Sequence, residues 1–188
     1  MKLPIAIDTV KGFLDPDEGK ALYDSLLNLN LHGPAVEIGS YCGKSTVYLG
    51  TACQLTGRQL VAVDHHNGSE ENQPGEGYFD PELADEATGG MSSLSYFRET
   101  LRRANLENVV VPIIASSAQA APLITQALAF VFIDGGHSMK AAFDDYRLWT
   151  GKLQTGGVLA IHDVFPNPED GGRPPYEIYK MAMASNLF

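Results

Sequence analysis

The sequence predicts an α/β fold built on a doubly wound, mainly parallel sheet. Five short runs rich in Val and Ile lack polar alternation, which is typical of strands buried on both faces: 35–38, 59–63, 109–114, 129–133 and 158–161. Segments with helical periodicity lie between them: 44–54, 93–105, 118–127 and 139–153. Alternating strands and helices imply right-handed crossovers, with helices on both faces of the sheet.

One domain is expected over residues 1–188. The chain has 188 residues and 44% hydrophobic content, enough for one ordinary core. We expect residues 1–33 to form an N-terminal helical segment. Asp15 is suited to cap this helix, Pro16 fits its first position, and Glu18 completes a capping box.

Charge and composition narrow the range of partners. Lys and Arg total 13 against 23 Asp and Glu, a net charge of -10, which repels a phosphate backbone and argues against nucleic acid. No run approaches the ~20 apolar residues that span a bilayer, so we expect no membrane partner. Cys42 and Cys53 form neither a disulfide framework nor a metal-binding CxxC, which favours a cytoplasmic protein with reduced thiols.

Two segments depart from the strand and helix pattern. Residues 67–90 are rich in Gly and Pro and hold seven carboxylates without Lys or Arg, so we expect an acidic loop insertion. After the fifth predicted strand come a Pro/Gly-rich loop and a helix from about Pro175, with no sixth or seventh strand. An uncovered sheet edge would then need a partner chain, and we expect a homodimer or marginal stability.

Segment 36–45, VEIGSYCGKS, follows the first predicted strand and opens a helix, where doubly wound folds bind their ligands. Gly39 and Gly43 permit a tight turn, and free amides at the helix start favour a carboxylate or phosphate. A P-loop needs four residues between its first glycine and Gly-Lys-Ser, and only three lie here. Ser40 and Tyr41 interrupt a GxGxxG fingerprint. The pattern that remains is ExGxxxG.

Asp64 ends the second predicted strand, 21 residues after Gly43. A carboxylate at this spacing is placed to accept hydrogen bonds from both hydroxyls of a ribose, which predicts an adenosine ligand. The alternative is a solvated Asp that closes the strand. His65 follows it and is a candidate for lining the same site.

Polar side chains follow the fourth and fifth predicted strands directly. FVFIDGGHSM delivers Asp134 and His137, and VLAIHDVFP delivers His162 and Asp163. The fourth and fifth strands are neighbours in this topology, so we expect these four groups to converge at the carboxyl edge of the sheet. Capping of loops by the carboxylates, with structural hydrogen bonds to the histidines, is the alternative.

ExGxxxG, IDGGHS and IHD together resemble the Rossmann-like class I S-adenosylmethionine-dependent methyltransferases, from about Glu37 to Pro166. The three motifs are most similar to those of a subgroup that includes sugar and macrolide O-methyltransferases and cephalosporin-hydroxylase relatives. The resemblance implies methyl transfer to an oxygen, or less readily a nitrogen, of a small molecule. Class I enzymes usually complete the sheet with an antiparallel strand pair, which is missing here. The implied contacts to S-adenosylmethionine are Glu37, Gly39, Ser40, Tyr41, Gly43, Ser45, Asp64, His65, Ser117 and Asp134.

The resemblance also implies a metal site. In catechol-type O-methyltransferases, acidic or amide residues at the tips of these strands hold Mg²⁺, and the corresponding positions here are Asp134, His162 and Asp163. A carboxylate is usual where His162 stands, and imidazole favours Mn, Fe or Zn over Mg²⁺. Without a metal, His137 or His162 is the candidate general base, which makes Asp134, His137 and His162 the candidate catalytic residues.

Some alternatives stay open at this point. A nicotinamide-dependent oxidoreductase would share the carboxylate on the second strand but lacks its glycine fingerprint. A non-catalytic adenosyl-ligand-binding protein would share the whole pocket. Ser117, at the adenine position of the family, fits a helix N-cap at least as well. The aromatic residues that we expect near an apolar acceptor are Tyr78, Phe79 and Tyr96.

Overall fold

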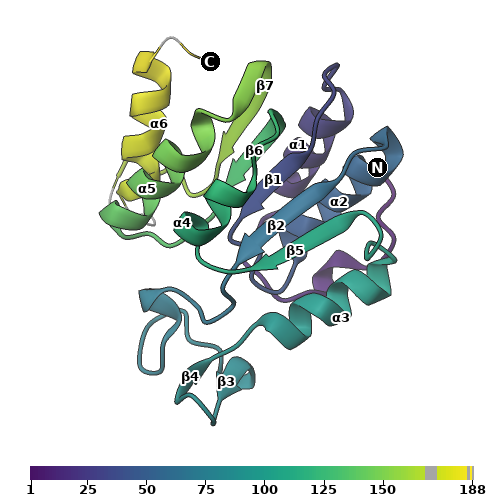
Figure 1. Ribbon diagram of the computed structural model, residues 1–188. Coiled ribbons are helices and arrows are strands. Elements are labelled where there is room, and N and C mark those ends of the chain that lie inside the picture. The colour runs from purple at the N-terminus through teal and green to yellow at the C-terminus, as the bar shows by residue number, and fades with distance from the viewer. Residues whose placement is uncertain (168–172, 186, 188) are drawn as a thin grey trace.

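Five strands form one parallel sheet in the order β5, β2, β1, β6, β7 (Figure 1). This computed structural model describes residues 1–167, 173–185 and 187. Every neighbouring pair in the sheet is parallel, which confirms the predicted fold class. The strands are β1 Ala35–Ile38, β2 Leu60–Asp64, β5 Val110–Ile114, β6 Leu128–Ile133 and β7 Leu153–Ile161.

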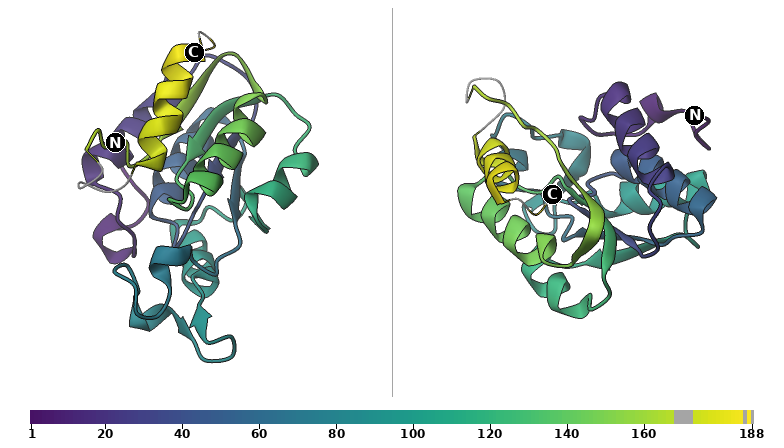
Figure 2. Two further views of the ribbon diagram at one scale, coloured as in Figure 1. Left: turned by 90° about the vertical axis from the view of Figure 1, so that its left-hand side faces the viewer. Right: turned by 90° about the horizontal axis from the view of Figure 1, so that it is seen from above.

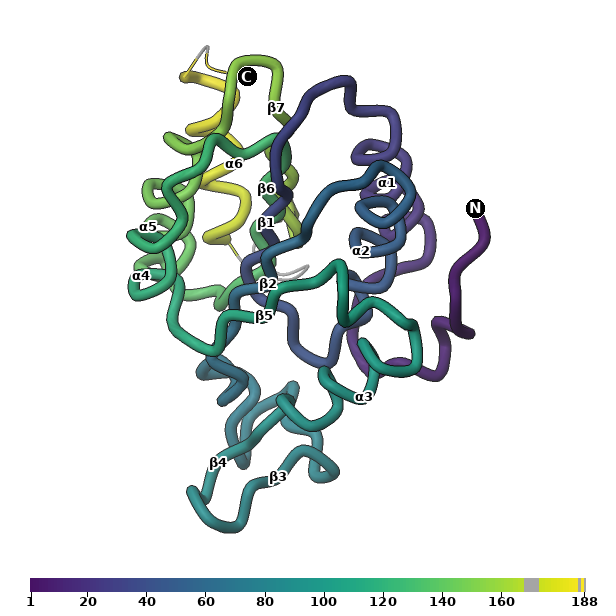
Figure 3. Tube along the Cα trace, turned by 45° about the vertical axis from the view of Figure 1, so that its right-hand side comes forward, coloured from purple at the N-terminus to yellow at the C-terminus, as the bar shows by residue number. Residues whose placement is uncertain are grey.

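Helices cover both faces of the sheet (Figures 2 and 3). Alternate side chains of each strand point to opposite faces, so Ala35 joins one core and Val36 the other. One layer consists of α1 Pro16–Leu27, α2 Lys44–Thr56 and α3 Leu94–Ala104. The other consists of α4 Ser117–Ala120, α5 Met139–Thr150 and α6 Pro174–Ser185. Within the described residues, no helix is long and apolar enough to cross a membrane.

Helix α1 begins as the sequence predicts. The Asp15 side chain accepts a hydrogen bond from the backbone N–H of Asp17 at 2.8 Å, and Glu18 accepts one from the backbone N–H of Asp15 at 3.1 Å. This capping box fixes the first turn and therefore the position of Glu18. The helix lies against α2, where Gly19 faces the ring of Tyr48.

Three predicted elements differ from the structure. The helix expected over 118–127 is only α4 plus a 3-10 turn, η4 Ala121–Leu123, because Pro122 has no backbone N–H with which to continue the α-helical hydrogen bonds. α5 ends at Thr150, and β7 begins at Leu153 instead of 158, because Leu153 already pairs with Leu128. The acidic loop contains two 3-10 turns and a small hairpin: η2 Glu70–Asn72, η3 Pro81–Leu83, β3 Ala84–Asp85 and β4 Gly90–Met91.

The C-terminal part agrees with the predicted order. After β7 the chain continues into α6, which packs beside α5. The described residues add no strand beyond β7, so the sheet lacks an antiparallel pair there. Part of the predicted Pro/Gly-rich loop, residues 168–172, lies outside the described residues.

A buried carboxylate belongs to the second helical layer. Asp145 on α5 is 5% exposed, and a Cβ on Gly135 would lie 2.6 Å from its Oδ2 atom. Burial raises the pKa of Asp145 to about 6, although its hydrogen bond to Ser117 acts in the opposite direction. Ionisation of Asp145 therefore lowers the stability of the folded protein.

We predict that Gly19→Ala destabilises the protein, although alanine favours helices more than glycine does. The new Cβ would lie 2.4 Å from a ring atom of Tyr48, so α1 and α2 would have to move apart. Overpacking of this kind costs about 1–3 kcal/mol. Urea unfolding measures it, with Ser25→Ala on the exposed face of α1 as the control. Gly19→Ala combined with Tyr48→Leu should regain stability. A Gly19→Ala protein as stable as the control would show that the helices do not pack this closely.

We predict that Asp145→Asn removes a pH-dependent loss of stability. The unfolded chain ionises this carboxyl near the ordinary pKa of 3.8, and the folded chain near 6. The folded state therefore loses stability as pH rises between these values, by about 2–3 kcal/mol in full. In urea unfolding from pH 4 to 7.5, the free energy of unfolding of the variant should rise relative to that of the wild type as the pH increases through this range. The exposed Asp17→Asn control should not gain, and a constant difference for Asp145→Asn would contradict the prediction.

Candidate active site

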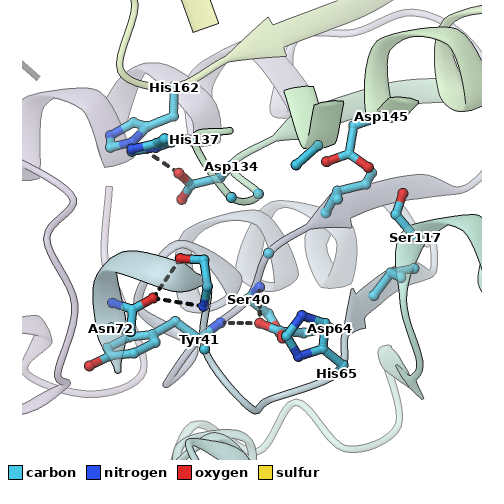
Figure 4. A pocket seen from close by; sticks show the side chains of 18 of the residues that line it. Ser40, Tyr41, Asp64, His65, Asn72, Ser117, Asp134, His137, Asp145 and His162 are labelled. Carbon is cyan, nitrogen blue, oxygen red and sulfur yellow. Dashed lines mark hydrogen bonds and ion pairs between the residues drawn. The ribbon is translucent and has the colours of Figure 1, made fainter. Parts of the chain in front are cut away.

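A pocket of about 460 Å³ lies at the carboxyl ends of the parallel strands (Figure 4). The turn after β1 and the tips of β2, β5, β6 and β7 form its floor and walls. N-terminal residues 11–14 and acidic-loop residues 68–72 also line it. A doubly wound sheet binds ligands at this edge, so the pocket is where the glycine turn predicts it.

The turn between β1 and α2 depends on its two glycines. Gly39 has φ +84° and Gly43, the N-cap of α2, has φ +91°, a left-handed conformation that glycine adopts without strain. A Cβ on Gly39 would lie 2.0 Å from the backbone oxygen of Asp134. Only a glycine therefore lets the tip of β6 approach the turn this closely.

Asp64 holds the turn in place. Its Oδ2 atom accepts hydrogen bonds from the backbone N–H groups of Ser40 at 2.9 Å and Tyr41 at 2.8 Å. Its Oδ1 atom accepts one from the N–H of His66 at 2.7 Å. The sequence predicted contacts to a ribose and missed this structural task. A carboxylate has about four acceptor positions, so one remains for a ligand that lies in the pocket beside it.

Glu37 supports the turn from below. It is fully buried, its Oε2 accepts a hydrogen bond from Thr46 Oγ1 at 2.6 Å, and it does not line the pocket. Burial raises its pKa to about 8, although the hydroxyls of Ser45 and Thr46 favour the charged form. Its Oε1 and the Oγ of Ser40 are buried without a hydrogen-bond partner. Glu37 thus packs beneath the turn while Ser40 and Ser45 line the cavity.

The adenosine end of the predicted site is built from β2 and β5. His65 and Ser117 both line the pocket. Ser116 is the N-cap of α4, and Ser117 Oγ accepts a hydrogen bond from Trp149 Nε1 at 2.7 Å. Ser117 therefore anchors the buried Trp149 as well as facing the cavity.

The structure brings the polar residues of β6 and β7 together. His162 Nδ1 lies 3.0 Å from Asp134 Oδ1 and 3.1 Å from Asp163 Oδ2. His137 Nε2 lies 3.0 Å from the same Asp163 oxygen. Asp163 adopts a left-handed backbone conformation with φ +54°, at the point where the chain leaves β7. We call Asp134, His137, His162 and Asp163 the tip cluster.

Opposite charges set the protonation of the tip cluster. Burial disfavours the charged form of His162, but Asp134 and Asp163 outweigh it and raise its pKa to about 11. Burial also works against ionised Asp163, yet His137 and His162 lower its pKa well below its usual range. Burial raises the pKa of Asp134, and the hydrogen bond to Asp163 raises that of His137. At neutral pH His162 is positive and Asp163 negative.

Two carboxylates that the sequence did not indicate extend the tip cluster. Glu18 Oε2 lies 3.1 Å from His162 Nε2, and Glu71 Oε1 lies 3.5 Å from His137 Nδ1. Glu18 lies in the first turn of α1, and the sequence predicted only a helix-capping role for it. Glu71 is one of seven carboxylates in the acidic loop, and nothing in the sequence distinguishes it from the others.

The aromatic residues expected near an acceptor are corrected in part. Tyr78, Phe79 and Tyr96 do not line the pocket. Its aromatic lining within the described residues is instead Phe13 and Tyr41. Phe13 lies in the N-terminal segment, far from every motif, so the sequence offered no signal for it.

The tip cluster also has the spacing of a metal site. The ligand atoms of Asp134, His162 and Asp163 lie within 4.8 Å of one another. Ligands about 2.1 Å from a divalent ion and at right angles to each other are about 3.0 Å apart, close to the separations found here. These three residues therefore fit a small divalent cation with mixed nitrogen and oxygen ligands.

Solved structures of methyltransferases have the same fold. The O-methyltransferase NovP is 16% identical with a TM-score of 0.66, covering 90% of this chain and 70% of that one. The SAH-bound Podospora anserina methyltransferase PaMTH1 is 13% identical with a TM-score of 0.61, covering 92% and 70%. A Staphylococcus aureus protein provisionally identified as a caffeoyl-CoA O-methyltransferase is 14% identical with a TM-score of 0.63, covering 94% and 77%.

The sequence family is shown directly. Residues 36–164 match the family described as a methyltransferase domain, and this range includes the glycine turn and the whole tip cluster. The match favours the methyltransferase over the nicotinamide-dependent oxidoreductase. The chain belongs to the methyltransferase-domain family, and its fold is that of the class I S-adenosylmethionine-dependent methyltransferases.

Proposed function

We propose that this methyltransferase acts on a hydroxyl oxygen of a small molecule. The observation that carries the proposal is the tip cluster, which lies in the same pocket as the glycine turn. A neutral hydroxyl is a weak nucleophile until its proton is removed or its pKa is lowered, and imidazole and carboxylate groups do both. Transfer to a nitrogen is the second candidate, because an amine acceptor would also lie against these groups.

The methyl donor occupies the part of the pocket between the glycine turn and α4. S-adenosylmethionine, when bound, supplies a methyl group on a positively charged sulfur, so catalysis consists mainly of alignment and deprotonation of the acceptor. The tip of β2 faces the ribose and the turn after β1 faces the methionine part. The proposed contacts are Gly39, Ser40, Tyr41, Ser45, Asp64, His65, Ser117 and Asp134. Glu37 and Gly43, which the resemblance also implied, do not line the pocket and shape the turn instead.

His137 is the proposed general base. Glu71 faces its Nδ1 atom at 3.5 Å, and a carboxylate at one ring nitrogen orients the imidazole so that the other nitrogen accepts a proton. Nε2 is paired with Asp163 at 3.0 Å, so the acceptor oxygen has to take the place of that carboxylate beside the ring. The acceptor proton then passes to Nε2 as the oxygen–carbon bond forms, and the sulfur keeps the electron pair of the broken bond. His162 suits this role less, because it faces three carboxylates, those of Asp134, Asp163 and Glu18, whereas His137 faces two.

Asp134, His162 and Asp163 are the proposed holders of a divalent metal. A metal there, when bound, lowers the pKa of an acceptor hydroxyl and orients it. The imidazole of His162 makes Mn²⁺ a better fit than Mg²⁺, which prefers oxygen ligands. Binding requires His162 to release its proton, because only the neutral ring is a ligand.

One candidate class of acceptor is the kind modified by the sugar and macrolide O-methyltransferase subgroup. The IDGGHS and IHD segments support this assignment, since they supply the tip cluster. A protein that binds the adenosyl ligand without catalysis remains the alternative outcome, and methyl transfer to any hydroxyl compound would exclude it.

We predict that Asp64→Asn weakens binding of S-adenosylhomocysteine by about 10- to 100-fold. The amide replaces an oxygen that accepts two backbone N–H groups, and charge-assisted hydrogen bonds contribute about 1.5–3 kcal/mol. Isothermal titration measures the dissociation constant. The control is Asp85→Asn, because Asp85 accepts similar local hydrogen bonds in the exposed β3–β4 hairpin. Equal affinities of the two variants would show that Asp64 does not organise the donor site.

We predict that Mn²⁺ stabilises the protein loaded with S-adenosylhomocysteine through the tip cluster. At 100 times its dissociation constant, a ligand of the folded state adds about 2.7 kcal/mol, which raises the melting temperature. Asp163→Asn should abolish the gain. Asp144→Asn should retain it, because this pocket carboxylate pairs with Lys140 outside the cluster. If Mn²⁺ and Mg²⁺ leave wild-type melting unchanged, the metal-assisted version is wrong and His137 acts alone.

A further inference from the structure

We propose that Phe13 and Tyr78 select the acceptor, by receiving an uncharged aromatic ring that carries the hydroxyl group. The proposal rests on the proposed O-methyl transfer and narrows its acceptor to an aromatic compound rather than a sugar. It stands on three rings from three segments that meet at the rim of the pocket. We call Phe13, Tyr41 and Tyr78 the aromatic rim.

The rings of the aromatic rim contact one another yet stay open to solvent. Phe13 lies 5.9 Å from Tyr41 and 5.5 Å from Tyr78 between ring centroids, the latter pair edge to face. Phe13 is nevertheless 66% exposed and Tyr78 is 52% exposed. Exposed aromatic surface is costly in water, and it stacks readily on a second ring. The rim therefore offers ring surface that the protein itself does not cover.

Ion pairs hold the aromatic rim together. Lys11 Nζ lies 2.6 Å from Asp80 Oδ2 and 2.6 Å from Glu82 Oε2, which joins the N-terminal segment to the acidic loop. Lys44 Nζ donates a hydrogen bond to the backbone oxygen of Gly12 at 3.0 Å. The residues just before Phe13 and just after Tyr78 are thus held in place before any acceptor arrives, which lowers the entropy cost of binding.

The aromatic rim is connected to the reacting groups. The backbone N–H of Tyr78 donates to the backbone oxygen of Glu71 at 3.1 Å, and the side chain of Glu71 faces His137. Phe13 and Tyr41 line the same pocket as His137 and Asp163. An acceptor ring against Phe13 and Tyr41 would therefore lie in the pocket that holds His137.

The charge around the aromatic rim favours an uncharged acceptor. Glu71, Asp80 and Glu82 come from a loop without Lys or Arg, and Lys11 is already paired with two of them. A carboxylate on the acceptor would meet these like charges, and Lys44, the pocket cation beside Phe13, already donates to the backbone oxygen of Gly12. We therefore expect a neutral phenol or catechol to bind better than the matching acid.

Isothermal titration of the full chain, saturated with S-adenosylhomocysteine, tests the proposal with three probes. They are methyl 3,4-dihydroxybenzoate, the free 3,4-dihydroxybenzoate anion, and methyl α-glucopyranoside as a non-aromatic polyol. The ester should bind more tightly than the anion, and the glucoside should bind weakest. Phe13→Ala should weaken binding of the ester about 3- to 10-fold, and Phe13→Trp should restore it because the ring is kept.

The controls separate the aromatic rim from the donor site. Tyr179→Ala removes an exposed aromatic side chain of α6 that does not line the pocket, and should change nothing. Phe13→Ala should leave the affinity for S-adenosylhomocysteine unchanged. Ester binding that survives Phe13→Ala, or a glucoside that binds as tightly as the ester, overturns the aromatic acceptor and leaves methyl transfer standing. Wild-type protein that fails to bind S-adenosylhomocysteine overturns both proposals.

Discussion

The close approach of β6 to the glycine turn is the constraint on which the site depends. Gly39 lies where any Cβ would meet the backbone oxygen of Asp134 at 2.0 Å, and the N–H of Asp134 donates to the oxygen of Ile38 at 2.8 Å. The side chain of Asp134 consequently lies beside the turn that faces the donor. Catalysis of methyl transfer depends mainly on the alignment of donor and acceptor. The absence of a side chain at Gly39 allows the donor site to lie next to the groups that contact the acceptor.

Two imidazoles reduce the repulsion between the carboxylates of the tip cluster. Two imidazoles and two aspartates from β6 and β7 meet at 3.0–3.1 Å, and Glu18 and Glu71 close the cluster from α1 and the acidic loop. Buried like charges would repel, and alternating imidazoles and carboxylates avoid this. A divalent cation or a proton on His162 satisfies the same carboxylates, so metal binding and protonation compete for one position.

Local signals made the fold predictable, and distant contacts limited the prediction of the site. Buried Val-rich runs, the capping box at Asp15 and the glycine turn act over a few residues, and the structure contains all of them. The helix expected over 118–127 failed because Pro122 interrupts it. Tertiary packing brings Glu18 to His162 and brings Glu71 and Phe13 to the pocket, and no spacing in the sequence records that packing.

Asp64 shows that a residue with a strong motif can also have a structural task that the motif does not indicate. Its position at the tip of β2 fits a ribose contact, yet in the structure it accepts three backbone N–H groups from the turn and from His66. The two tasks are compatible, because bonds from backbone amides fix the carboxylate in one orientation and leave an acceptor position free. A fixed carboxylate loses less entropy when a ligand binds than a mobile one does. The order of the turn and the recognition of adenosine are therefore expected to depend on the same side chain.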